Sequence, residues 1–456
     1  VQYSADFCPA ITLKLITIRS RFMEMTLDKS QQKSSFIPMA IVAALFFILG
    51  FATWLNGSLM PYLKQILQLN PFQASLILFS FYIAVTFTAL PSAWLIRKVG
   101  YKNGMALGMG VMMLAGLLFI PAAKTQVFAL FLFAQLVMGA GQTLLQTAVN
   151  PYVVRLGPEE SAAARVSVMG ILNKGAGVIA PLVFSALILD SFKDRIGTTL
   201  TQVQIDEMAN SLVFPYLGMA VFIGVLALAV KKSPLPELSN EDEVAEHTDK
   251  SQIKAALSHP NLAFGVLALF VYVAVEVIAG DTIGTFALSL GVEHYGVMTS
   301  YTMVCMVLGY TLGIILIPRI ISQPTALMIS AILGILLTLG ILFGDNNSYA
   351  IANALLVPFG GVALPDTLLF IAFLGLANAI VWPAVWPLAL SGLGKLTSTG
   401  SALLIMGIAG GAFGPLFWGL TSSATDMGQQ GGYMVMLPCY LFILFYAVKG
   451  HKMRHW

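Results

Sequence analysis

Residues 150–182 read NPYVVRLGPEESAAARVSVMGILNKGAGVIAPL, and residues 386–416 read WPLALSGLGKLTSTGSALLIMGIAGGAFGPL. Each stretch carries an early proline, a Leu-Gly pair, a Met-Gly-Ile triplet and a Pro-Leu pair, in that order. Asn150 precedes Met169 by 19 residues, and Trp386 precedes Met406 by 20. Self-similarity at corresponding places of a chain is the mark of a structural repeat. The two stretches therefore predict a protein built from two related halves.

The composition around these stretches is that of a membrane protein. The chain is 58% hydrophobic and 10% charged, with a mean hydropathy of +0.85, whereas a soluble domain carries roughly 25% charged residues. Apolar runs of about 20 residues recur, which is the length of a membrane-spanning helix. A membrane β-barrel would instead show alternating segments of about 10 residues. We expect an all-α integral membrane protein.

Twelve apolar segments are long enough to span a bilayer, six in each half. They are 37–60, 72–97, 103–122, 127–154, 166–190, 212–231, 261–290, 297–318, 325–344, 366–390, 398–421 and 431–449. The apolar stretch 349–357 is too short to span and is expected to be a re-entrant or interfacial piece. Two six-helix halves of the same orientation imply a binding site between them near the bilayer midplane.

The polar stretches divide the chain further. We expect a leader at 1–36, disordered or partly non-native, with the natural start near Met25. Six-helix bundles follow at 37–231 and 261–449, joined by a solvated linker at 232–260, and a short tail occupies 450–456. Placing both termini in the cytoplasm puts nineteen Lys and Arg residues inside and four outside, as the positive-inside rule requires.

Several function classes lack support in the sequence. The net charge of +3 is spread over loops, so we expect no nucleic-acid partner. Cys8, Cys305 and Cys439 are isolated, and the five histidines lie outside the apolar cores. No phosphate loop and no nucleophile or zinc motif is present. We therefore expect neither an enzyme nor a bound cofactor, and no ATP-driven transport by this chain alone.

A stripe of amides lies on the fourth segment. Gln142, Gln146 and Asn150 are spaced i, i+4 and i+8, so they share one helix face. Amides in membrane helices often hydrogen-bond to a neighbouring helix. Three in register exceed what packing usually needs, and we favour the lining of a cavity. Asn56, at the end of the first segment, is a further polar candidate.

The tenth segment carries the matching register. Asn378, Trp382 and Trp386 again fall at i, i+4 and i+8. Tryptophan is often an interfacial anchor, which suits Trp386 better than the deeper Trp382. An indole face opposite a row of amides suits a sugar, because amides donate to and accept from hydroxyls while aromatic rings supply flat apolar area.

Only three charged residues lie deep inside the apolar segments: Lys174, Glu276 and Asp281. A charge at the bilayer centre is costly, so such residues usually mark a pathway or a pair. Lys174 follows Asn173, a further substrate candidate. Lys174 either snorkels toward the membrane surface or forms a structural or gating ion pair with one of the two carboxylates. Tyr272 and Glu276 are four residues apart and share a helix face, so both are candidates for the substrate site.

The two carboxylates of the seventh segment are expected to differ in role. Glu276 and Asp281 are five residues apart, about 140° around an ideal helix. A helix break near Gly280 would free backbone carbonyls beside Asp281, Thr282 and Thr285, and such oxygens suit a cation such as Na⁺. The sequence leaves open whether Glu276 or Asp281 couples a cation, and we favour Asp281.

Several motifs resemble one transporter family. Residues 53–57 (TWLNG), 146–152 (QTAVNPY), 156–163, 169–174 (MGILNK) and 275–277 are similar to the glucose/galactose branch of the fucose–galactose–glucose:cation symporters, within the major facilitator superfamily. The resemblance covers about 36–450. It implies two pseudo-symmetric six-helix bundles, alternating access, and a bacterial inner-membrane location.

The chain departs from this pattern at three places. Arg97 stands where the general facilitator signature has an acidic residue. Fucose permease uses carboxylates at the positions that Gly57 and Gln146 occupy. Its proton mechanism therefore cannot be transferred, and because an animal branch of the family is sodium-coupled, both Na⁺ and H⁺ stay open.

The sequence thus predicts a monomeric, cation-coupled hexose symporter in contact with membrane lipid. An N-acetylhexosamine permease of the same family is one alternative. A second is an exporter of amphipathic small molecules, which would favour a cavity lined by Met and Phe rather than amide stripes. A sugar sensor is a third, but the tail after Lys449 is too short for a signalling domain.

Overall fold

A computed structural model describes residues 37–155, 162–189, 191–192, 200–235, 250–317 and 319–456. The predicted leader and about half of the predicted linker, residues 236–249, lie outside these residues. The described part is helical and contains twelve helices long and apolar enough to cross a membrane, which confirms the predicted number. They are Ile37–Ile66, Pro71–Val99, Tyr101–Thr125, Phe128–Asn150, Val168–Leu187, Gln202–Lys232, Pro260–Asp281, Tyr295–Leu316, Gln323–Phe343, Asp366–Leu390, Thr399–Ala424 and Gly428–Lys452.

The spans consist of the following helices. In the first six spans (the N-terminal half) these are α2 (Asn56–Ile66), α3 (Pro71–Val99), α4 (Tyr101–Thr125), α5 (Phe128–Arg155), α6 (Ala162–Leu187), α7 (Gln202–Ser211) and α8 (Val213–Lys232). A short helix, α9 (Lys250–Leu257), precedes the second six spans. In those spans and their connections (the C-terminal half) the helices are α10 (Pro260–Asp281), α11 (Ile283–Ser289), η4 (Tyr295–Val297), α12 (Met298–Leu316), α13 (Gln323–Phe343), α14 (Ala350–Leu355), η5 (Val357–Phe359), α15 (Asp366–Ala379), α16 (Val381–Leu390), η6 (Gly394–Leu396), α17 (Thr397–Met406), η7 (Gly407–Ala409), α18 (Gly410–Ala424), α19 (Gly428–Gly432), η8 (Tyr433–Val435), α20 (Met436–Val448) and η9 (Gly450–Lys452).

Three spans differ clearly from the segments that hydropathy predicts. The sixth begins at Gln202 instead of 212, because it includes α7. The first continues to Ile66 and is interrupted at Leu55, where α2 begins. The predicted segment 261–290 is divided in two, because α10 ends at Asp281 and α11 begins at Ile283. The break at Thr282 lies two residues after Gly280, where the sequence left a break open. Both interruptions occur in helices that face the opposite half, where packing against a neighbour offsets the lost helical hydrogen bonds.

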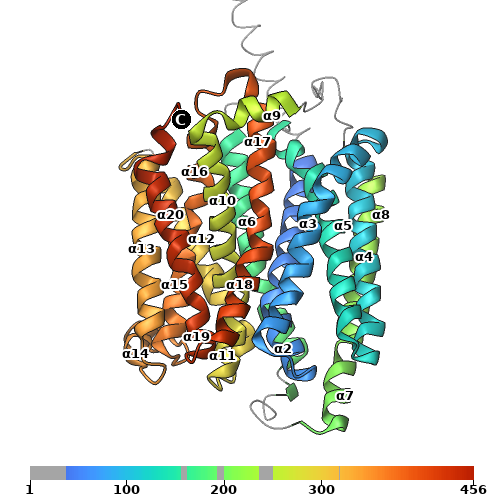
Figure 1. The fold of residues 1–456 in the computed structure, drawn as a ribbon. Coiled ribbons are helices and arrows are strands. Elements are labelled where there is room, and N and C mark those ends of the chain that lie inside the picture. The colour runs from blue at the N-terminus through green and yellow to red at the C-terminus, as the bar shows by residue number, and fades with distance from the viewer. Residues whose placement is uncertain (1–36, 156–161, 190, 193–199, 236–249, 318) are drawn as a thin grey trace, which may run out of the picture.

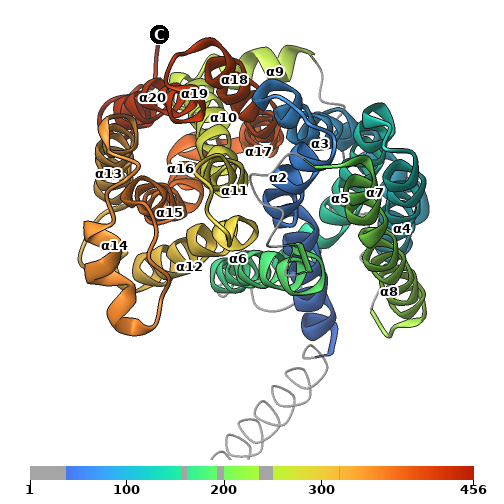
Figure 2. The ribbon, with the colours of Figure 1, turned by 90° about the horizontal axis from the view of Figure 1, so that it is seen from below.

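The spans form two bundles that meet along one seam. Figure 2 shows α3, α4, α5 and α8 on one side and α13, α15, α16 and α20 on the other, with α6 beside α12 and α3 close to α18 between them. Within a bundle, small residues allow close approach: a side chain at Gly108 of α4 would overlap the α5 backbone at Leu145. Such contacts replace the hydrophobic effect as the main source of helix association in lipid.

The two ends of the bundle differ. One end carries α7, α11, α14 and α19, and the other carries α9 and the C-terminus; these are named the α7 side and the α9 side (Figure 1). The predicted interfacial piece at 349–357 lies in α14 and η5 on the α7 side. The predicted linker includes α9, which packs against α10 and α17.

The halves pack tightly toward the α7 side. Ser58 of α2 donates to the Gly296 carbonyl, and the Ser300 hydroxyl donates to the Val178 carbonyl over 2.7 Å. A side chain at Gly284 of α11 would lie 3.0 Å from the Gly57 carbonyl of α2. These contacts place the backbones of the two halves against each other, so the α7 side of the seam is closed.

Candidate functional site

A salt bridge joins the two halves at the centre of the seam. The Lys174 ammonium of α6 donates to Glu276 of α10, with Nζ 2.6 Å from Oε1. Each side chain is 10% exposed. Of the two carboxylates that the sequence offers, the structure pairs Lys174 with Glu276. Such a close pair offsets part of the cost of removing both charges from water.

Trp54, the last residue before the break at Leu55, covers this ion pair. Lys174 Nζ lies 4.3 Å from the centre of the Trp54 ring, within the range of a cation–π interaction. The indole fits between two glycines: a side chain at Gly177 or Gly280 would come within 2.7 Å of it. Its Nε1 points to Asn173 Oδ1 at 3.4 Å. Trp54 thus connects α6 to α10 across the seam.

Aromatic side chains extend from this centre along the C-terminal half. The rings of Tyr272 and Trp382 are 6.2 Å apart, and those of Trp382 and Trp386 are 5.7 Å apart. Tyr272 and Tyr310 also lie close enough to Glu276 to interact with its charge. The structure therefore brings together three aromatic candidates and one carboxylate, and Trp386 Nε1 has no hydrogen-bond partner within the described residues.

The amide stripe of α5 becomes more accessible toward the α9 side. Gln142 is buried, Gln146 is partly buried and Asn150 is exposed. Gln142 Nε2 donates to the Thr53 hydroxyl over 2.5 Å, while its Oε1 finds no described partner. Asn378, Trp382 and Trp386 show a similar trend from buried to partly buried. Exposure therefore increases toward the α9 side (Figure 1) along both stripes.

Two predicted residues point into their own bundles instead. The Asn378 side chain is fully buried, and its Oδ1 accepts from Tyr440 of α20 over 2.8 Å. Asn56 Oδ1 accepts from Gln135 Nε2 of α5 over 2.8 Å. The structure therefore does not bring Asn56 or Asn378 together with the central cluster.

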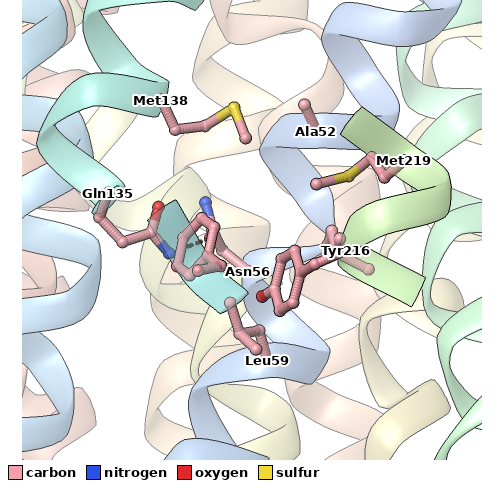
Figure 3. A pocket seen from close by; sticks show the side chains of 9 residues that line it. Ala52, Asn56, Leu59, Gln135, Met138, Tyr216 and Met219 are labelled. Carbon is pink, nitrogen blue, oxygen red and sulfur yellow. Dashed lines mark hydrogen bonds between the residues drawn. The ribbon is translucent and has the colours of Figure 1, made fainter. Parts of the chain in front are cut away.

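Figure 3 shows the pocket around Asn56, inside the N-terminal half. Asn56, Gln135 and Tyr216 supply its polar atoms, and Met138 and Met219 are among its apolar lining. Its volume of about 10 Å³ is close to the space that one water molecule requires. Asn56 Nδ2 and the Tyr216 hydroxyl have no partner among the described residues, so one ordered water suits this pocket and a sugar does not fit.

Asp281 occupies a separate place, where α10 ends. Its side chain is 0% exposed, and neither carboxylate oxygen has a hydrogen-bond partner within the described residues. The Thr285 hydroxyl is likewise buried without such a partner. Thr282 instead donates to the Ile278 carbonyl and lies 3.0 Å from the Tyr433 hydroxyl. Glu276 and Asp281 therefore differ in environment, as their spacing predicts.

Sequence reasoning missed several neighbours of these residues. Trp54 and Thr53 lie two and three residues before Asn56, and no spacing pattern links them to the other candidates. Tyr82 of α3 and Thr299 of α12 also reach the seam. Tyr82 lies close enough to Asp281 to interact with its charge. Thr299 donates a hydrogen bond to the Gly280 carbonyl over 2.7 Å. No local spacing marks Tyr82 or Thr299, because they approach from other helices.

Known proteins resemble this chain over most of its length. A family model described as Major Facilitator Superfamily matches residues 42–415. The chain is 33% identical over 427 residues to the glucose/galactose transporter of Brucella abortus biovar 1 (strain 9-941), covering 93% of this chain and 97% of that protein. It is 29% identical over 443 residues to the L-fucose-proton symporter of Escherichia coli K12, covering 92% and 94%.

Solved structures show the same architecture. The transporter FucP in its outward conformation is 27% identical, with a TM-score of 0.63 over 91% of this chain and 98% of that chain. The nucleoside transporter NupG has a TM-score of 0.61 over 90% of this chain and 97% of that chain, at 16% identity. The second likeness concerns the fold alone.

Proposed function

The chain belongs to the Major Facilitator Superfamily, and we propose that it is a secondary active sugar transporter that takes up hexoses such as glucose or galactose together with Na⁺ or H⁺. The printed functions of its relatives support a sugar substrate: glucose/galactose transport in Brucella abortus and L-fucose–proton symport in Escherichia coli. In this proposal the α9 side faces the cytoplasm, in line with the positive-inside count.

One observation carries the choice of substrate class. Two buried polar atoms have no described partner: Gln142 Oε1 on the amide stripe and Trp386 Nε1 in the row of aromatic side chains. An unpaired buried polar group costs roughly 1–3 kcal/mol, and a sugar hydroxyl, as donor and acceptor, satisfies either one. Trp382 and Tyr272 supply the flat apolar area on which the C–H face of a sugar ring stacks.

Gln146, Asn150 and Asn173 complete the proposed sugar site. The exposed Asn150 and partly buried Gln146 meet a sugar near the α9 side. Asn173 holds Trp54 and donates weakly to the Phe46 carbonyl at 3.4 Å. Asn56 and Asn378 do not contact the sugar in this proposal. Their hydrogen bonds to Gln135 and Tyr440 hold α2 and α15 in place within their own bundles.

The two carboxylates receive different roles in the proposal. The Glu276 charge is balanced by Lys174, so this pair acts as a gating tie between the halves. Asp281 has no such partner among the described residues, and Thr285, four residues further on, carries a second buried oxygen without one. We therefore assign the coupling cation to Asp281, with Thr285 and the break at Thr282 in support.

Uptake into proteoliposomes tests this function. Labelled glucose, galactose and N-acetylglucosamine are offered with and without a Na⁺ gradient and with and without a pH gradient. We expect accumulation of at least one hexose that depends on one of the two gradients. Accumulation unaffected by both gradients would refute the coupling, and failure to bind or carry all three sugars would refute the substrate class.

Substitution of the aromatic wall sharpens the test. Trp382→Ala removes the stacking surface and is expected to weaken hexose binding at least about tenfold, or about 1.4 kcal/mol. Trp94→Ala is the matched control, because Trp94 is 52% exposed near the end of α3. Equal losses in both variants would contradict a sugar site at Trp382.

A further inference from the structure

The side chain of Asp281 fits into a space on the seam that a glycine leaves free. Gly57 of α2 lies opposite the end of α10, and a side chain there would overlap the Thr299 hydroxyl and come 3.1 Å from Asp281 Oδ1. Gly57 adjoins Ser58, which bonds to Gly296 across the closed α7 side. The same closure that brings α2 against α11 and η4 therefore buries Asp281.

The surrounding donors are already used. Thr299 donates to the Gly280 carbonyl, Thr302 to the Ala279 carbonyl and Thr282 to the Ile278 carbonyl. Lys174 is bound to Glu276. Among the described titratable groups, Lys174, Glu276 and Tyr82 lie close enough to interact with the charge of Asp281. None of them forms a hydrogen bond with its carboxylate.

A negative charge in this position would be costly. A buried carboxylate without a partner loses its hydration and gains no compensating bond, a penalty of several kcal/mol. The closed arrangement is therefore favourable when the carboxylate is neutralised, either by a proton or by a monovalent cation that shares the Asp281 and Thr285 oxygens. In an arrangement with α2 withdrawn, water would solvate the charge.

We propose that Asp281 is a cation-dependent latch: the α7 side closes over it when a proton or Na⁺ neutralises the carboxylate, and opens when the charge returns. The latch rests on the proposed function, whose coupling site it explains. It converts cation binding into a shift of the conformational equilibrium, since a ligand shifts an equilibrium by its differential affinity for the two states.

The latch is tested without sugar, by the accessibility of a reporter cysteine. Ser185→Cys is suitable because Ser185 of α6 is buried beside Gly296 on the closed side. Cys8, Cys305 and Cys439 are replaced by serine, and an impermeant maleimide is added to the α7 side of oriented proteoliposomes. In alkaline, sodium-free buffer we expect rapid labelling. Acid, if the ligand is a proton, or Na⁺ should slow labelling at least about fivefold. All rates are taken relative to Asn347→Cys, an exposed position on the same side, in the same buffer, because acid also lowers the reactive thiolate fraction of any cysteine.

Asp281→Asn supplies the decisive comparison. The neutral amide should close the α7 side in every buffer, so labelling stays slow and no longer responds to acid or Na⁺. Asp426→Asn, an exposed carboxylate on the same side, is the matched control and should respond as the parent does. A parent that ignores both acid and Na⁺, or an Asp281→Asn variant that responds as the parent does, would overturn the latch.

A size change tests the same space without altering charge. Gly57→Ala should prevent closure and keep the Ser185→Cys reporter accessible to the maleimide in all buffers, whereas adding Thr299→Gly makes room and should restore protection. Parent-like protection in Gly57→Ala alone would also overturn the latch. Because labelling needs no sugar, a responsive reporter in a protein that carries no hexose would refute the proposed function and leave the latch standing.

Discussion

At the scale of single residues, the two opposite charges of one buried salt bridge stabilise the contact between the halves. Lys174 and Glu276 lie 2.6 Å apart, and the Trp54 ring lies 4.3 Å from the ammonium. Removing one partner of a buried pair typically costs about 3–5 kcal/mol, because the other charge stays desolvated. Removing both leaves no stranded charge, so the interaction is strongly non-additive.

We predict that Lys174→Met and Glu276→Gln each lower the thermal midpoint of the detergent-purified protein, while Lys174→Met/Glu276→Gln loses less than the sum of the two. Lys98→Met is the control, since Lys98 also lies over a tryptophan, at 3.9 Å from the exposed Trp94 ring. Thermal unfolding of the four variants measures this. Additive single losses would show that the pair contributes little.

At the scale of elements, one carboxylate organises a connection between spans. Asp366 begins α15, and its oxygens accept from the Ser348 hydroxyl and from the backbone amides of Ile351 and Ala352 at the start of α14. A side-chain oxygen at this place satisfies amides that have no partner within the helix. Asp366 thereby fixes the short helix against the end of α15.

We predict that Asp366→Ala destabilises the protein by about 0.5–2 kcal/mol, the range for loss of a helix cap. Hexose affinity should stay unchanged, because α14 lies at the α7 end (Figure 1). Asp345→Ala is the matched control, since exposed Asp345 caps only a turn at Asn347. Thermal unfolding and sugar-binding titration measure the two effects. A large loss of affinity in Asp366→Ala would place α14 in the transport path.

At the scale of the whole molecule, closure on one side defines the state of the transporter. The seam is packed at the α7 side, while the amide stripe grows more exposed toward the α9 side. In the proposed orientation, with the α9 side in the cytoplasm, this corresponds to a conformation that opens to the cytoplasm. The orientation follows from loop charges alone and can be measured directly.

We predict that, in intact cells, an impermeant maleimide labels Asn347→Cys on the α7 side and not Lys254→Cys in α9, in a background without the natural cysteines. Both positions are exposed. Inside-out vesicles should reverse the pattern. Labelling of Lys254→Cys in intact cells would place the α9 side outside and invert the proposed direction of opening.

Hydropathy and periodicity predicted much of this molecule. The twelve spans follow from apolar runs whose length matches the bilayer, a property local to each segment. The i, i+4, i+8 spacing correctly placed Gln142, Gln146 and Asn150 on one face of α5, and the five-residue separation indicated that Glu276 and Asp281 meet different surroundings. The sequence left open a helix break near Gly280, and the structure has one at Thr282.

Tertiary packing decided the rest. The rotation of a helix about its axis and the choice of a partner depend on neighbours distant in sequence, and no local pattern contains that information. For this reason Asn56 turned toward Gln135 and Asn378 toward Tyr440, and Lys174 met Glu276 rather than Asp281. The sequence alone determined that three charges lie within the membrane. Only the folded seam decided which of them are paired and which carboxylate is buried alone, because the cost of a buried charge depends on what stands beside it.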